Sequence, residues 1–110
     1  MATSYKVLGQ EALTAETETV VYTVPAGTQA VVSTIVVCNR ATAANTFRIA
    51  VRPDGNTLAN EHYIAYDVTV SETDATNLTL GITLSAGDLV TAYAGAASEV
   101  SVNIFGSEIT

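Results

Sequence analysis

Two turn sequences of nearly the same form constrain the fold of this chain more than any other feature. The first is Pro-Ala-Gly at 25–27 and the second is Ser-Ala-Gly at 85–87, and each lies between two runs rich in Val, Leu, Tyr and Thr. Two turn residues followed by a glycine in the left-handed conformation are typical of a β-hairpin. Pro25 suits the first turn position because its φ is already fixed near the required value. Both sequences therefore predict hairpins in an antiparallel β protein.

Strand-like runs continue along the whole chain, and no segment of useful length has helical periodicity. The candidate strands are residues 5–8, 17–24, 29–39, 45–52, 62–70, 77–84, 89–93 and 100–106. Runs separated by regular turn signals are typical of a β-sandwich or barrel. We expect an N-terminal arm with a short edge strand at 1–16 and a single β-sandwich domain at 17–110.

The run 29–39 is apolar on both faces if its side chains alternate. One face carries Ala30, Val32, Val36 and Cys38, and the other carries Val31, Ile35 and Val37. A strand of this kind is expected at the centre of a sheet, with its second face covered by a loop or another subunit. The face of Val31, Ile35 and Val37 is therefore a candidate assembly interface. In the run 62–70, the same alternation groups Ile64 and Tyr66 with Val68, opposite Asp67.

Few charges cover this chain of 110 residues, of which 14% are charged and 48% are hydrophobic. Average globular chains have roughly 25% charged residues, so we expect part of the surface to be buried against copies of the chain or a partner. The net charge is −7 and the basic residues are not clustered, which argues against direct binding to nucleic acid. Arg48 and Arg52 either meet an acidic neighbour across the sheet or remain solvated, and we include their surface in the candidate self-association interface.

A single cysteine, Cys38, excludes a disulfide within the chain, and its apolar surroundings predict a buried small side chain. We find no signal-peptide pattern at the N-terminus and no apolar stretch of the roughly 20 residues that cross a membrane. We therefore expect a protein that folds in the cytoplasm and does not enter a membrane.

Catalytic and metal-binding patterns are weak. His62 is the only histidine, so any Ser-His or Cys-His pair would require it. Its neighbour Glu61 would point to the opposite face of a strand. The only close groupings among the other carboxylates are two isolated i, i+2 pairs, Glu16 with Glu18 and Glu72 with Asp74. We expect no enzymatic activity and no cofactor or metal. The five tyrosines could pack within strands or form a platform for glycans.

The sequence also resembles a known family. The block from 22 to 39 reads Tyr-Thr-Val-Pro-Ala-Gly-Thr-Gln-Ala-Val-Val-Ser-Thr-Ile-Val-Val-Cys-Asn. It resembles the opening of small all-β structural proteins of tailed bacteriophages, and the segments 47–53 and 61–67 extend the resemblance to about residues 20–93. Proteins of this kind are decoration (cement) proteins of the capsid, tail-fibre modules, or accessories of the neck and tail. The segment 84–90 is similar to a hairpin in jelly-roll trimers of the tumour-necrosis-factor type. That similarity implies a jelly-roll-like sandwich of about eight strands and a homotrimer.

The resemblance implies a non-enzymatic virion protein, assembled in the cytoplasm of a bacterial host. Its expected partner is the major capsid protein, or alternatively a tail protein, and its expected action is to stabilise the shell where subunits meet. Lys6, Val7 and Leu8, within the arm 2–13, could add a strand to an exposed edge of the partner. The alternative is a tail- or fibre-associated module that binds glycans or a receptor through the tyrosine-bearing loop 54–63.

Overall fold

The β-prone runs form nine strands among the residues that the computed structural model describes, 2–95 and 98–110. The strands are β1 (Thr3–Leu13), β2 (Thr19–Thr23), β3 (Gln29–Asn39), β4 (Asn45–Arg52), β5 (Tyr63–Val70), β6 (Ala75–Leu78), β7 (Ile82–Leu84), β8 (Leu89–Ala94) and β9 (Val100–Ile109). Two short 3-10 turns, η1 (Pro53–Gly55) and η2 (Asn60–His62), separate β4 from β5. No helix within these two stretches is long and apolar enough to cross a membrane.

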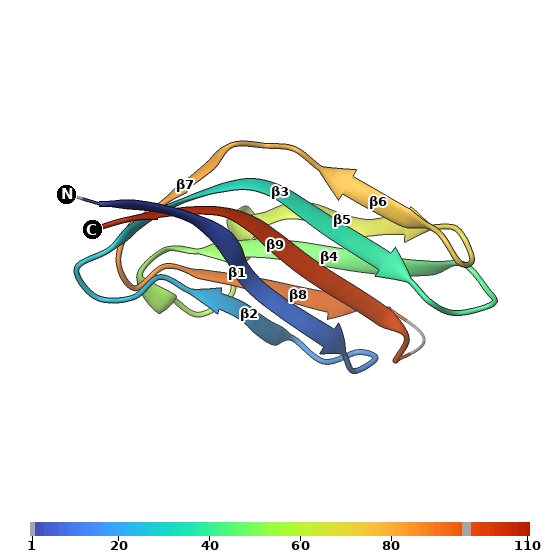
Figure 1. The fold of residues 1–110 in the computed structure, drawn as a ribbon. Helices are drawn as coiled ribbons and strands as arrows, with labels where there is room; N and C mark the ends of the chain where they lie inside the picture. Colours follow the sequence, from blue (N-terminus) through green and yellow to red (C-terminus); the bar gives the residue numbers. More distant parts are fainter. Residues whose placement is uncertain (1, 96–97) are drawn as a thin grey trace.

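The strands pair into two antiparallel sheets that lie face to face (Figure 1). The five-stranded sheet has the order β1-β9-β3-β6, with β7 paired to another part of β3, and the four-stranded sheet has the order β2-β8-β4-β5. The run 77–84, expected as one strand, is divided around Gly81, whose φ is +63°. When β6 and β7 are counted as one interrupted strand, the strand order is that of a jelly roll. The predicted antiparallel β-sandwich is confirmed.

Strand β1 forms one edge of the five-stranded sheet and pairs with β9 from Thr3 to Leu13. It is therefore longer than the expected strand at 5–8. Its last residue, Leu13, is only 1% exposed and belongs to the core. The chain then crosses to the other sheet, where the Glu16 amide donates a hydrogen bond of 2.8 Å to the Ala94 carbonyl.

Both Ala-Gly turns connect one sheet to the other, so the predicted hairpins are wrong. Gly27 and Gly87 have the left-handed φ that the turn sequences require, +71° and +89°. However, β2 and β3 lie in different sheets, and so do β7 and β8. The Gly87 amide donates to the Val24 carbonyl and the Val24 amide donates to the Asp88 carbonyl, each over 3.0 Å. The strand before the first turn therefore pairs with the strand after the second turn.

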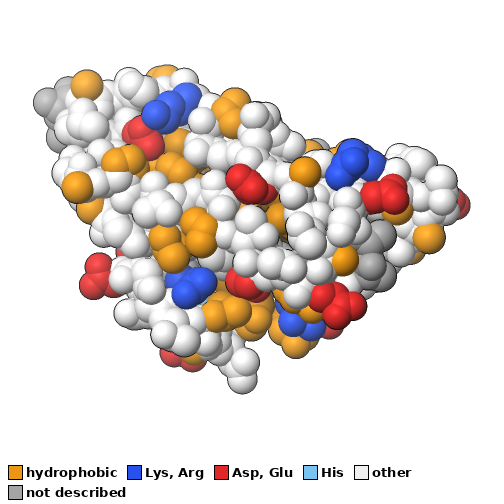
Figure 2. Space-filling model, turned by 90° about the horizontal axis from the view of Figure 1, so that it is seen from below, with side chains coloured by type: hydrophobic (Ala, Val, Ile, Leu, Met, Phe, Trp, Pro, Cys, Tyr) orange, Lys and Arg blue, Asp and Glu red, His pale blue; other side chains and the backbone are white. Residues whose placement is uncertain are grey.

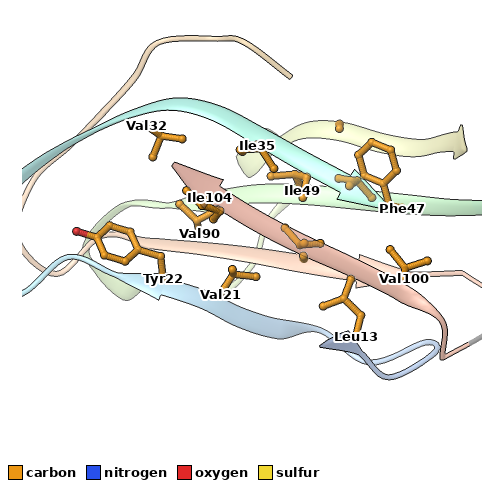
Figure 3. Close-up of a cluster of buried hydrophobic side chains, with 14 of the residues drawn as sticks. Leu13, Val21, Tyr22, Val32, Ile35, Phe47, Ile49, Val90, Val100 and Ile104 are labelled. Atoms are coloured by element: carbon orange, nitrogen blue, oxygen red, sulfur yellow. The ribbon is translucent and has the colours of Figure 1, made fainter. Parts of the chain in front are cut away.

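Apolar side chains fill the space between the two sheets (Figure 3). The largest fully buried ones include Phe47, Leu13, Ile35, Ile49 and Ile104. Such close packing of β-branched and aromatic side chains is the main source of stability in a sandwich of this size. Tyr22 lies at one end of the cluster, with its hydroxyl directed out of it.

A β-bulge in β3 changes which of its side chains face the core. Val32 pairs with Gly106 and Thr34 pairs with Phe105, so Ser33 is an extra residue and the alternation is shifted beyond it. As a result, Ile35 and Val37 are 0% exposed, and only Val31 of the expected interface residues faces outward. The prediction that Ile35 and Val37 lie on an outward face with Val31 is wrong, although β3 is central as expected.

A second bulge changes the faces of β5. Phe47 pairs with Val68 and Ile49 pairs with Ala65, so β5 has one more residue than β4 in this interval. Asp67 lies at this point with a left-handed φ of +50°. Tyr66 and Asp67 are both exposed, whereas Val68 packs against the core. The expected grouping of Ile64 and Tyr66 with Val68 is therefore wrong.

Candidate functional site

A groove of about 610 Å³ crosses the outer face of the five-stranded sheet over β1, β9 and β3. We call it the β1–β9–β3 groove. Its lining residues are Tyr5, Lys6, Val7, Val31, Ser33, Phe105, Gly106 and Ser107. Tyr5 is 85% exposed and Val7 is 46% exposed, although both are large hydrophobic residues. The groove therefore combines apolar side chains that are open to solvent with the edge strand of the sheet.

Three of the predicted interaction residues, Lys6, Val7 and Val31, meet in this groove. They come from strands far apart in the sequence, which pair with the two sides of β9. Leu8 belongs to the same predicted docking segment but differs from its neighbours. It is an extra residue opposite β9, because Val7 pairs with Phe105 and Gly9 pairs with Ile104, and it packs partly buried against the core.

The charge of Lys6 is neutralised beside the groove. Its Nζ lies 2.6 Å from Oε1 of Glu108, and the Tyr22 hydroxyl donates to Oε2 of the same carboxylate over 2.6 Å. Lys6 and, to a smaller extent, Tyr22 hold the pKa of Glu108 below its ordinary value. Burial, reinforced by the bond to Glu108, raises the pKa of the Tyr22 hydroxyl above its ordinary value. This network ties the four-stranded sheet, through β2, to β1 and β9 of the other sheet.

Arg48 lies on the opposite side of the molecule, on the outer face of the four-stranded sheet. Its Nε donates to Oδ1 of Asp67 over 2.6 Å and one Nη donates to Oδ2 over 3.3 Å. Its guanidinium carbon lies 4.2 Å from the ring centre of Tyr66 and 4.5 Å from that of Tyr93. The bond to Asp67 raises the pKa of Arg48 above its ordinary value. Of the two alternatives for Arg48, the acidic neighbour across the sheet is the one observed.

Arg52 lies on β4 but takes no part in this arrangement. Its Nε donates to the backbone carbonyl of Asn56 over 2.8 Å, which holds the loop after η1 against the end of the strand. The predicted Arg48/Arg52 surface therefore contains two side chains with different local roles.

Phe105 and Asp67 were not singled out from the sequence as site residues, and Tyr5 and Tyr66 were considered only among the five tyrosines of a candidate glycan platform. Tyr5 and Phe105 line the groove, and Phe105 could have been found, because it alternates with the buried Ile104 within the predicted run 100–106. Asp67 and Tyr66 share the outer face with Arg48 only because of the bulge in β5. Alternation alone places those two side chains on opposite faces.

His62 has a local structural role in η2. Its Nδ1 accepts a hydrogen bond of 3.0 Å from the Ala59 amide and closes the turn. Cys38 is a free thiol and half-buried. Within 2–95 and 98–110, no three His, Cys, Asp or Glu side chains are grouped so that they could hold a metal ion.

Hydrophobic side chains are distributed over the visible surface in Figure 2, singly or in small groups among polar atoms, and charged side chains are sparse. No protein-family model, curated protein or solved structure matches the chain.

Proposed function

We propose that this chain is a non-enzymatic structural protein of a tailed-phage virion, and specifically a capsid decoration or cement protein. The observation that carries the proposal is the β1–β9–β3 groove. Of its lining residues only Lys6 is charged, and Glu108 compensates that charge at 2.6 Å. Burying Tyr5 and Val7 against a partner would remove exposed apolar surface from water without burying an unpaired charge.

The edge position of β1 supports the same mode of docking. One side of β1 pairs with β9, and the sheet ends at β1. An unpaired strand edge beside an apolar groove can accept a strand of a partner, with backbone hydrogen bonds giving affinity and the groove giving specificity. The partner we propose is the major capsid protein, where neighbouring shell subunits meet.

Several weak contacts would then act together. In a homotrimer, the first docked subunit raises the effective concentration of the other two at adjacent sites. Such a trimer would raise the free energy required to separate the shell subunits. The resemblance to jelly-roll trimers and the low charge content of the chain, 14%, support this arrangement.

The test is to add the purified protein to phage particles that lack it and to measure bound copies and their position by electron microscopy. We expect one set of sites distributed over the whole shell and a raised temperature of particle disruption. A few copies confined to the tail would contradict the proposal.

A pair of matched variants tests the groove itself. Val7 and Val20 are each 46% exposed, but Val7 lines the groove and Val20 lies on β2 of the four-stranded sheet. We expect Val7→Glu to weaken particle binding at least about ten-fold, which corresponds to 1.4 kcal/mol, while Val20→Glu binds as the unmodified protein does. Equal effects of the two substitutions would exclude the groove as the docking surface.

A further inference from the structure

The outer face of the four-stranded sheet has a cluster of aromatic and charged side chains that the proposed docking does not use. We call Tyr63, Tyr66, Tyr93, Arg48 and Asp67 the tyrosine cluster. The residues come from three adjacent strands, β5, β4 and β8. The rings of Tyr63 and Tyr66 meet edge to face, with their centres 4.9 Å apart. The guanidinium of Arg48 lies over the rings of both Tyr66 and Tyr93.

The side chains of the cluster are held in place before any ligand arrives. Arg48 is fixed by two hydrogen bonds to Asp67 and by the rings of Tyr66 and Tyr93. The bulge in β5, with Asp67 at a φ of +50°, places Tyr66 and Asp67 on the same face. Left-handed backbone at a non-glycine residue costs of order 1 kcal/mol or more and is found preferentially at binding sites. Side chains that are already ordered lose little entropy on binding.

The exposed atoms of the cluster define the ligand chemistry. Tyr66 is 56% exposed and the neighbouring Ile64 is 41% exposed, which offers apolar surface to a ligand. A guanidinium has five N–H donors, and Asp67 occupies two of them. The remaining donors, the tyrosine hydroxyls and the half-exposed Asp67 carboxylate provide both donors and acceptors around the rings.

A sugar ring also combines apolar surface with hydrogen-bonding groups, because it has C–H groups on its faces and hydroxyls at its rim. Aromatic rings that pack against an apolar face, with a few fixed polar groups for orientation, are typical of small-ligand sites. The cluster extends over two strand spacings, about 10 Å, which is enough for a short oligosaccharide. Arg48 and Asp67 compensate each other and the chain has a net charge of −7, so an uncharged ligand is favoured over an anion.

We propose that the tyrosine cluster is a binding site for a neutral oligosaccharide. The site lies on the sheet face, it includes Tyr63 of the loop 54–63 only as the first residue of β5, and it leaves the β1–β9–β3 groove free for docking. The oligosaccharide proposal can therefore be confirmed or overturned independently of the proposed virion role.

The experiment is a titration of the isotope-labelled protein, followed by NMR, with tetrasaccharides of glucose, galactose, mannose and N-acetylglucosamine. A sulfated and a sialylated oligosaccharide serve as anionic comparisons. We expect at least one neutral tetrasaccharide to bind saturably, with chemical-shift changes concentrated at Tyr66, Arg48 and Tyr93. Tyr66→Ala should weaken that binding at least about ten-fold, as the loss of an aromatic anchor does.

Tyr5 provides the matched control, because it is an even more exposed tyrosine on the other sheet. Tyr5→Ala should leave sugar binding unchanged, and the melting temperature of each variant should show that it is folded. The proposal is overturned if no neutral tetrasaccharide binds, if only the anionic ones bind, or if the shift changes lie in the β1–β9–β3 groove. Equal weakening by Tyr66→Ala and Tyr5→Ala would also overturn it.

Discussion

Gly106 lies where the backbone of the five-stranded sheet leaves no room for a side chain. A Cβ at this position would overlap the carbonyl oxygen of Val31 and lie 3.0 Å from the Cα of Val32. Both contacts are with backbone of the bulged strand, which cannot rotate away. We expect Gly106→Ala to lower the free energy of unfolding by about 1–3 kcal/mol, measured by urea denaturation. Ser107→Ala, at the next position, should change it by less than about 0.5 kcal/mol, and equal effects would contradict this account.

The network of Lys6, Tyr22 and Glu108 predicts how stability depends on pH. Because the pKa of Glu108 is lowered in the folded state, its contribution is present above the ordinary carboxyl pKa of about 4.3 and is lost as the pH falls through the folded value. The pKa of Tyr22 is raised, so its contribution is complete below about pH 10 and is lost as the pH rises through the folded value. Stability from this network is therefore greatest between these limits.

Glu108→Gln tests the acid side of this dependence. We expect the variant to be less stable than the unmodified protein at neutral pH and the two urea midpoints to converge as the pH falls below about 4. Glu72→Gln serves as the control, because Glu72 is exposed and belongs to no ion pair that the described residues form. A constant difference between Glu108→Gln and the unmodified protein at all pH values would show that the charge of Glu108 is not responsible.

At the scale of elements, Asp88 joins the second Ala-Gly turn to η1. Its Oδ2 accepts from the Ser85 amide and its Oδ1 accepts from the Asp54 amide, each over 2.8 Å. Asp88→Ala removes both bonds, and we expect a loss of about 1–3 kcal/mol in the free energy of unfolding. Asp74→Ala is the comparison, because among the described residues the Asp74 carboxylate accepts only from the adjacent Ala75 amide, and the Asp74 backbone carbonyl, which accepts from the Asn39 amide, is kept in the variant. A smaller loss for Asp88→Ala than for Asp74→Ala would exclude this role of the Asp88 carboxylate.

The positions of most strands could be predicted from the sequence, but the full length of β1, the break between β6 and β7 and the connections could not. Gly27 and Gly87 have the predicted left-handed φ, and β3 and β4 have the predicted bounds. A turn of this kind, however, can return within one sheet or cross to the other. The choice depends on which strands pair elsewhere, as the bonds of Val24 to the second turn show.

The candidate sites were predicted less well, for a related reason. An extra residue in a strand exchanges the inner and outer faces beyond it, and no local pattern marks Ser33 or Asp67 as such a residue. The exchange places Ile35 in the core and Tyr66 beside Asp67 on the surface. Val31 precedes the bulge in β3, so its predicted outward face is correct. Lys6 and Val7 were placed in the docking segment for strand addition, a prediction that did not depend on which face each side chain occupies.

At the scale of the whole molecule, the two ends of the described chain are joined by hydrogen bonds. The Ala2 amide donates to the Thr110 carbonyl and the Thr110 amide donates to the Ala2 carbonyl, each over 2.9 Å. Both ends lie together at one end of the sandwich in Figure 1. A short linker can therefore connect residues 2 and 110 without moving β1 or β9.

This arrangement predicts that a circular permutant folds. We expect a permutant opened between Asn56 and Thr57, in an exposed loop outside the strands, to retain the sandwich and to lose no more than about 2 kcal/mol of stability. One opened between Ala86 and Gly87 should lose more, because that cut separates β7 from β8 where Gly87 bonds to Val24. Circular dichroism and urea denaturation measure both. The first permutant is expected to be the more stable because the turns, rather than the joined ends, hold the two sheets in register. The prediction is wrong if the first permutant fails to fold or is less stable than the second.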